Sequence, residues 1–251
     1  YKVVILSKYC IVDFRMRKVE KEYIKSLGYE IIENKFNLKT YDEISSHVDI
    51  YYLNVNGNIF CAPGKKIDGF NMLVGNSEVG SAYPEDVLYN MAIIGRNAVH
   101  NFKHTDKNVL AYLKGAGYNL VQVDQGYTKC STCVLSDNAC IVSDIGIART
   151  LLDLGVDVLY VSEPDIKLLK RTNKIFVDEE RMRFEYSDMS GFIGGALVRL
   201  GDTVILFGDK ANLINGSKIQ KFIESKGLKF HYFEGLDIID YGGIIEVEKN
   251  I

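Results

Sequence analysis

Four stretches of the chain share one order of apolar and polar positions, which predicts a helix, then a glycine, then a strand. Each has an amphipathic run that ends at a glycine and is followed by apolar or β-branched residues. Glycine just past a helix adopts the left-handed conformation at little cost, and the run after it is typical of a strand. The stretches are KSLGYEII around Gly28, KGAGYNLV around Gly117, LDLGVDVL around Gly155 and ESKGLKFH around Gly227.

Short hairpins are predicted ahead of three of these helices, because turn residues there are flanked by β-branched or apolar residues. The hairpins span residues 91–101, 132–143 and 196–208. A fourth, at residues 50–62, turns at Asn56-Gly57, which is the strongest short hairpin signal. The pattern therefore predicts a unit made of strand, strand, helix and strand.

The chain accommodates five such units, and the first is divided between its two ends. A unit completed by both ends closes a ring and leaves no open edge. We therefore predict one α/β domain over residues 1–251, a five-bladed pseudo-symmetric α/β propeller. Residues 163–190 are expected to be an insertion, with the charged run at residues 178–185 in a loop. The units are residues 238–247 with 1–34, then 50–79 (with a weak helix), 89–123, 125–161 and 190–233.

Composition and charge limit the classes of binding partner that can be expected. The 251 residues carry a net charge of −3 without a basic stripe, so neither nucleic acid nor an anionic membrane is expected as a partner. No apolar run approaches the roughly 20 residues that span a bilayer. The N-terminal run is too short for a signal peptide and is interpreted as a first strand. Five cysteines, an odd number, predict free thiols in the cytoplasm; no cofactor is expected, and the oligomeric state stays open.

Several runs of the sequence resemble a bacterial family of unknown function that has the pentein fold, also called the guanidino-group-modifying enzyme fold. The resemblance is strongest from Tyr83 to the C-terminus. Arginine deiminases, agmatine deiminases, dimethylarginine dimethylaminohydrolases and amidinotransferases share this fold. The runs are QGYTKCST, SDIGIARTLLDLGVDVLYV, SGFIGGALVRLGDTVILFGD and LDIIDYGGIIEV.

The resemblance to those enzymes implies a funnel at the centre of the ring. Acidic residues there would hold a guanidinium, a cysteine would attack its carbon, and a histidine would move protons. The enzymes keep this cysteine near the C-terminus, but this chain has no cysteine after Cys140. The run Asp240-Tyr241-Gly242-Gly243-Ile244 offers no thiol and no adjacent histidine. The usual hydrolytic site therefore does not transfer to its usual place.

Cys130, within QGYTKCST, is the candidate nucleophile, because glycine precedes it and Ser and Thr follow it. The alternative is a small buried apolar residue. Cys130 and Cys133 form a CxxC, but no second pair of ligands exists for zinc. On a strand the two cysteines would point to opposite faces, and so would Lys129 and Cys130. His100 is the candidate proton carrier; for it and for His47, His104 and His231 the alternative is a surface or hydrogen-bonded role.

Candidate ligand-binding residues lie at the junctions between units, where strand ends converge on the ring centre. Asp124 and Gln125 are favoured because they lie beside the QGY turn, and Asn90 opens the third unit. Asp240 is a further acidic candidate, with Asp144 and Asp188. Each has a structural alternative; Asp144, for instance, is a natural helix N-cap. Gly194, in the run at residues 191–195 that we expect to enter a strand, would allow close approach of either a ligand or a neighbouring unit.

These features support two hypotheses. The first is a hydrolase or binder of a guanidino or amino-acid-like small molecule in a central funnel, which if catalytic would act on a C–N bond through Cys130. The alternative is a catalytically inactive pentein that serves as a ligand-binding or protein-interaction module. Whether Cys130 and a histidine face one site near a carboxylate distinguishes them.

Overall fold

The computed structural model describes residues 8–172 and 182–249, and these residues contain five three-stranded sheets with the same connectivity. In each sheet the first strand is antiparallel to the second, and the second is parallel to the third. The sheets are β17 (Ile245–Val247), β1 (Lys8–Asp13) and β2 (Tyr29–Asn34); β3 (Tyr52–Val55), β4 (Asn58–Cys61) and β5 (Met72–Val74); β6 (Ala92–Ile94), β7 (Asn97–His100) and β8 (Asn119–Gln122); β9 (Thr132–Ser136), β10 (Ala139–Val142) and β11 (Asp157–Tyr160); β14 (Leu197–Leu200), β15 (Thr203–Leu206) and β16 (Lys229–His231).

Helices join the second and third strands in four of these sheets: α1 (Lys18–Ser26), α3 (Lys107–Gly115), α4 (Ile145–Asp153) and α6 (Gly216–Ser225). The glycines predicted to follow them, Gly28, Gly117, Gly155 and Gly227, all have positive φ. Asp144 caps the start of α4 by accepting a hydrogen bond from the backbone of Ile147, so its structural alternative is the one observed. The weak helix expected between β4 and β5 is wrong, since turns occupy that connection.

The two ends of the chain meet in one sheet, where Cys10 of β1 is opposite Glu246 of β17. The beginning of the expected first strand, at residues 1–7, lies outside the described residues. The expected insertion contains a separate antiparallel pair, β12 (Lys167–Arg171) and β13 (Phe184–Ser190). The expected charged loop falls partly outside the described residues, at 178–181.

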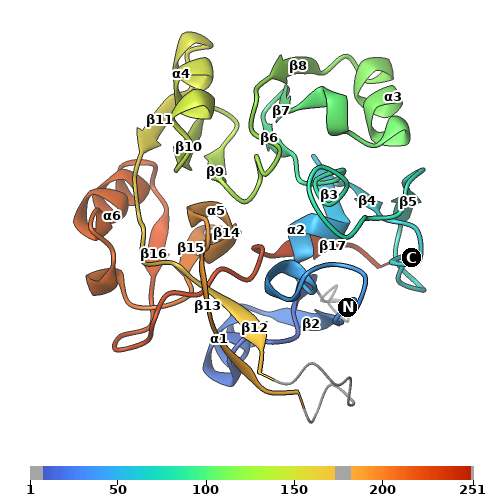
Figure 1. The fold of residues 1–251 in the computed structure, drawn as a ribbon. Helices are drawn as coiled ribbons and strands as arrows, with labels where there is room; N and C mark the ends of the chain where they lie inside the picture. The colour runs from blue at the N-terminus through green and yellow to red at the C-terminus, as the bar shows by residue number, and fades with distance from the viewer. Residues whose placement is uncertain (1–7, 173–181, 250–251) are drawn as a thin grey trace, which may run out of the picture.

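The sheets surround the middle of the molecule, with α1, α3, α4 and α6 on the outside (Figure 1). Two short helices, α2 (Val48–Tyr51) and α5 (Ile193–Ala196), lie near the middle (Figure 1). The run at residues 191–195 enters the helical turn α5 first, and the expected strand follows directly as β14. The shorter 3-10 turns are η1 (Asp42–Ile44), η2 (Phe102–His104) and η4 (Lys210–Asn212).

Apolar side chains of neighbouring sheets pack into shared cores. Cys133 packs with β14 and α6 residues in one core, and Cys140 packs with β6 and α4 residues in another. All five cysteines are buried and free, as the sequence predicts. No helix in the described part of the chain is long and apolar enough to cross a bilayer.

Candidate functional site

Cys130 lies in the turn that precedes β9, and its side chain is almost fully buried, with 2% exposed. Its sulfur donates a hydrogen bond to Oδ2 of Asp49 at 3.1 Å. It accepts one from Nδ2 of Asn90 at 3.0 Å. Burial raises the pKa of the Cys130 thiol well above its usual value, and the carboxylates of Asp49 and Asp240 raise it further. The thiol is therefore protonated near neutral pH, and a carboxylate is in position to take the proton.

Asn90 fixes the shape of the Cys130 turn. Its Oδ1 accepts hydrogen bonds from the backbone N–H groups of Lys129 (2.9 Å) and Cys130 (3.2 Å). Its Nδ2 also donates to the backbone oxygen of Asp49 at 3.2 Å. Because Oδ1 faces two donors, the amide must present its N–H₂ to the sulfur and to Asp49. One buried side chain therefore holds the thiol and the carboxylate together.

Asp49, on α2, is completely surrounded by protein. Burial raises its pKa to about 7, the nearby Asp240 acts in the same direction, and the Lys129 ammonium opposes both. Lys129 Nζ donates to the backbone oxygen of Gly194 at 3.1 Å. The prediction that Lys129 and Cys130 would point apart on a strand is wrong, because they belong to a turn and both act on Asp49.

Asp240 is the second buried carboxylate of this region. Its two oxygens accept hydrogen bonds from the backbone N–H groups of Phe192 and Gly242, both at 2.8 Å. A Cβ on Gly195 would lie 1.8 Å from Oδ1 of Asp240, and a Cβ on Gly194 would lie 2.4 Å from the Lys129 carbonyl oxygen. Both glycines therefore lie in close contact with other parts of the protein, and Gly194 closely approaches the backbone of the neighbouring unit.

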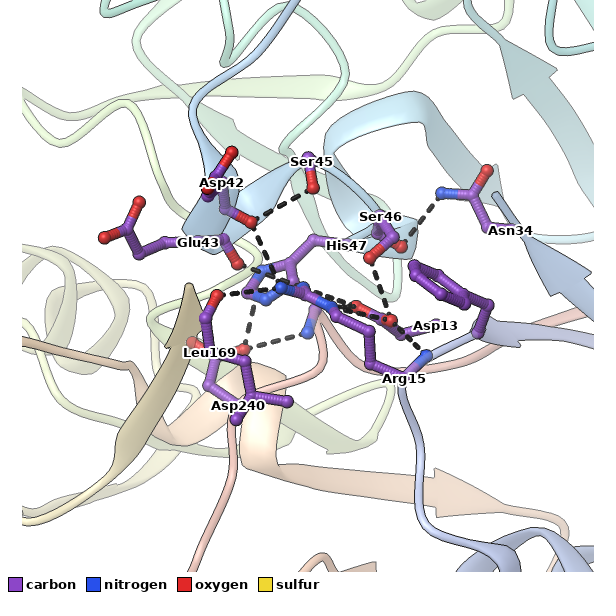
Figure 2. Close-up of polar contacts among 12 residues, drawn as sticks. Asp13, Arg15, Asn34, Asp42, Glu43, Ser45, Ser46, His47, Leu169 and Asp240 are labelled. Carbon is purple, nitrogen blue, oxygen red and sulfur yellow. Dashed lines mark hydrogen bonds and ion pairs between the residues drawn. The ribbon is translucent and has the colours of Figure 1, made fainter. Parts of the chain in front are cut away.

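A buried ion pair between Asp13 and Arg15 lies in the same region as Asp240 (Figure 2). The Arg15 guanidinium donates to both Asp13 oxygens and to the backbone oxygens of Asp42, Glu43 and Leu169. Burial disfavours charge on Asp13, but the Arg15 guanidinium holds the pKa of the Asp13 carboxyl below its usual value. The pair thus joins β1, η1 and β12 through an almost fully satisfied guanidinium.

His47 lies between this ion pair and Asp240, with its Nδ1 3.7 Å from Oδ1 of Asp240 (Figure 2). Burial lowers the pKa of His47, and the Arg15 charge lowers it further, against the attraction of Asp240. Neither ring nitrogen has a hydrogen-bond partner among the described residues. The expectation of a surface or hydrogen-bonded role is therefore wrong for His47.

We call these residues the central cluster: Asp13, Arg15, His47, Asp49, Asn90, Lys129, Cys130 and Asp240. Several buried polar atoms in and beside it have no hydrogen-bond partner in the described part of the chain, namely Asp49 Oδ1, both His47 nitrogens, Ser131 Oγ and Thr132 Oγ1. Buried polar groups are normally paired, so these atoms retain unused capacity for hydrogen bonds. Within the described ranges, no three His, Cys, Asp or Glu side chains are grouped to hold a metal ion.

The structure brings together four residues singled out from the sequence: Cys130, Asn90, Asp240 and, through the Lys129 contact, Gly194. Asp124 is exposed and Gln125 half-buried, and they line a separate surface hollow of about 510 Å³ with Asp144. Gln125 contacts Asp144 and the backbone of Tyr127. No contact among the described residues joins either of them to Cys130.

His100 is buried, and both of its ring nitrogens are engaged. Nδ1 is 2.7 Å from Thr105 Oγ1, and Nε2 is 3.0 Å from the Gly126 carbonyl oxygen. Burial lowers the pKa of His100 to about 4, so the ring is neutral at physiological pH. His100 thus supports the turn that leads to Cys130 and makes no direct contact with the thiol.

Sequence reasoning missed Asp13, Arg15 and Asp49 and undervalued His47. A signal was available in His47-Val48-Asp49, which directly precedes the hairpin at Asn56-Gly57 and so occupies a unit junction. Likewise, Asp13 ends β1 and Arg15 follows it.

Comparison with known proteins places the fold. A sequence model described as "Family of unknown function (DUF6873)" matches residues 11–245. No curated protein matches the sequence. A crystal structure of dimethylarginine dimethylaminohydrolase, an adduct with 4-chloro-2-hydroxymethylpyridine, superimposes with a TM-score of 0.51 at 12% identity, covering 92% of this chain and 93% of that one.

Two further solved structures are similar at lower scores. The dimethylarginine dimethylaminohydrolase (DDAH) from Pseudomonas aeruginosa gives a TM-score of 0.49 at 10% identity, with 94% and 93% of the chains covered. Agmatine deiminase from C. jejuni gives 0.46 at 10% identity, with 90% and 87% covered. The likeness at 0.51 is what shows that this chain shares the pentein fold, as its sequence resemblance implies.

Proposed function

The chain belongs to the family of unknown function DUF6873, and we propose that it binds a small guanidino or amino-acid-like molecule at the central cluster and hydrolyses a C–N bond of that molecule through Cys130. The observation that carries the proposal is the contact between the Cys130 sulfur and Asp49, 3.1 Å long and supported by Asn90. A thiol next to a carboxyl whose pKa is about 7 has the acid–base partner that a cysteine nucleophile needs.

We also propose that the five sheets form a closed five-bladed propeller with the central cluster at its middle. The pairing of β17 with β1 supports closure, because the first sheet needs both ends of the chain. The cluster draws its residues from the junctions of several sheets, which supports a central position.

The proposed reaction begins with transfer of the Cys130 proton to Asp49. The sulfur forms a bond to the central carbon of the guanidinium, the C–N bond breaks, and the amine leaves with the proton from Asp49. Water then attacks the thiouronium carbon and gives a proton to Asp49, and the C–S bond breaks. The neutral ureido product leaves, the Asp49 proton returns to the sulfur, and the second proton of the water passes to the released amine, so one water is consumed and one ammonium ion is released.

Asp49, rather than His100, takes the proton in this proposal, because both His100 nitrogens are bonded elsewhere. Asp240, held by two backbone N–H groups, is assigned to the positive charge of the bound molecule. Asp124 and Gln125 are given no part in the reaction, because they line the separate surface hollow beside α4.

A second candidate is binding without hydrolysis. It is favoured by one observation: the Cys130 thiol is buried next to two carboxylates, which raise its pKa and oppose formation of the thiolate. The orphan polar atoms of the cluster serve this function equally well.

A turnover screen distinguishes the candidates. Arginine, agmatine and N-methylated arginines are incubated with the wild type, with Cys130→Ala and with Cys133→Ala, and ureido product and released amine are quantified. The proposal expects product from at least one compound, a loss of at least about a hundredfold in Cys130→Ala, and little change in Cys133→Ala. Binding by calorimetry without product supports the second candidate, while neither binding nor product overturns both.

A further inference from the structure

Tyr127 is the middle member of a hydrogen-bonded chain that also contains Tyr41 and Asp86. The Tyr127 hydroxyl donates to Oδ2 of Asp86 at 2.7 Å. The Tyr41 and Tyr127 hydroxyl oxygens are 2.8 Å apart. Because the single proton of Tyr127 is given to Asp86, Tyr41 must donate to Tyr127. The chain therefore has one consistent direction, from Tyr41 through Tyr127 to the carboxylate.

Its three members come from the three segments that carry the thiol site. Tyr41 immediately precedes η1, which leads to Asp49. Tyr127 lies in the turn that carries Cys130, and Asp86 lies four positions before Asn90. The two hydroxyl hydrogen bonds thus hold together the segments that surround the Cys130 sulfur. The residues that form these bonds do not themselves contact the sulfur.

Aromatic rings surround this chain at the boundary between the cluster and solvent. The Tyr127 ring packs against Phe192, with centroids 6.1 Å apart, and against Tyr83, at 6.0 Å. The backbone N–H of Phe192 is bonded to Asp240, so this ring adjoins the cluster directly. Tyr41, Tyr127 and Phe192 are half-buried and Tyr83 is 49% exposed, whereas Cys130 and Asp240 are buried. A molecule that reaches the sulfur from this side must pass these rings.

We propose that the Tyr41–Tyr127–Asp86 chain is the latch of a gate over Cys130. When the two hydroxyl bonds break, the Tyr41 and Tyr127 side chains move apart and a small molecule enters beside Phe192, while Arg15 keeps η1 in place through the backbone oxygens of Asp42 and Glu43. The inference goes beyond the proposed reaction, since it concerns access and holds whether the site hydrolyses its ligand or only binds it.

The contacts of Asp86 make the latch cooperative. Asp86 is fully buried, and its Oδ1 has no hydrogen-bond partner within the described residues. The bond from Tyr127 is therefore a main support of the carboxylate, and losing it leaves a buried acid poorly satisfied. Opening at Tyr127 consequently weakens more of the gate than opening at Tyr41 alone.

Alkylation of Cys130 by iodoacetamide tests the latch on the full chain. Rates at a fixed pH are read for each cysteine by peptide mass spectrometry, in the wild type, Tyr41→Phe and Tyr127→Phe. Tyr186→Phe is the matched control, because Tyr186 donates to the carboxylate of Asp237 at 2.8 Å on the surface. Cys133, 1% exposed in the adjacent strand, is the internal control for general loosening.

The latch predicts that Cys130 labels roughly fivefold faster in Tyr41→Phe and at least about tenfold faster in Tyr127→Phe, with Cys133 unchanged and Tyr186→Phe like the wild type. Equal Cys130 rates in the wild type and in Tyr41→Phe overturn it. A parallel rise at Cys133 in Tyr41→Phe also overturns it, because the protein then loosens as a whole. Turnover plays no part in this readout, so failure of the proposed reaction is distinguished from failure of the latch.

Discussion

The sulfur of Cys130 lies 3.1 Å from Oδ2 of Asp49, although 81 positions separate the two residues in the chain. Asn90, from a third segment, binds both partners. Each of the pair is protonated more readily than usual because burial disfavours its charged form. The contact therefore places the thiol proton of Cys130 next to a carboxyl group in a buried polar site.

Asp49→Asn is expected to make Cys130 easier to ionise. The substitution removes the carboxylate that raises the thiol pKa, while burial remains. The alkaline midpoint of Cys130 alkylation should fall by roughly one pH unit. Cys133 in the same protein is the control, because burial dominates its raised pKa and Asp49 does not contribute. An unchanged Cys130 midpoint would show that the two groups are not coupled.

The same variant should change how stability depends on pH. The pKa of Asp49 is about 7 in the folded protein against 3.8 ordinarily. The folded state then binds more protons than the unfolded state between these values, so this group's contribution falls as pH rises from about 4 to 7, by up to about 4 kcal/mol. Urea unfolding of wild type and Asp49→Asn across that range gives the difference.

Subtracting the two stability profiles cancels the contributions of His47 and His100, which are the same in both proteins. Their lowered pKa values make stability rise with pH, opposite to the effect of Asp49. The wild type should lose stability relative to Asp49→Asn on going from pH 4 to 7. Parallel profiles would mean that Asp49 titrates near its ordinary pKa.

Gly195→Ala should destabilise the protein by about 1–3 kcal/mol. The new Cβ would lie 1.8 Å from Oδ1 of Asp240, and backbone N–H groups hold that carboxylate in place. Gly115→Ala is the matched control, since it lies at the end of α3 with no atom within 4 Å of the added Cβ. Chemical denaturation should show the control unchanged or slightly stabilised; equal effects would contradict a tight contact at Asp240.

Arg15→Lys should cost about 3–5 kcal/mol, although the charge is kept. Lysine cannot reproduce a guanidinium that binds Asp13 through two nitrogens and also reaches three backbone oxygens. Lys18→Ala breaks an exposed ion pair with Glu22 and should change stability by less than about 0.5 kcal/mol. Urea unfolding of both compares a buried pair with an exposed one, and similar small effects would refute the structural role of Arg15.

The strand and helix pattern was readable from the sequence because it depends on local chemistry. Asn56-Gly57 specifies a hairpin through positive φ at both positions, and Gly117 or Gly155 ends a helix for the same reason. The missing helix between β4 and β5 shows the limit of this reasoning. The helical pattern of the sequence was weak there, and the chain forms turns instead.

Only part of the candidate site could be predicted from the sequence, because its contacts join segments far apart in the chain. Asn90 and Asp240 were found through their places at unit junctions, and Cys130 through the glycine before it and the Ser and Thr after it, but nothing local pairs Cys130 with Asp49. The interpretation of residues 130–133 as a strand hid the turn that brings Lys129 and Cys130 to one carboxylate. His100 was preferred because it lies at the end of a predicted strand, whereas the burial of His47 with unpaired nitrogens leaves no trace in the neighbouring sequence.

Acid-quenched mass spectrometry of the wild type during exposure to arginine, agmatine and N,N-dimethylarginine tests the central claim most directly. The proposal predicts that at least one compound adds a thiouronium group to the peptide that carries Cys130. That adduct should be absent from Cys130→Ala and from the peptides of the other four cysteines. An unmodified Cys130 with every compound, in a protein that releases ureido product, would contradict the account, because hydrolysis would then proceed without this thiol.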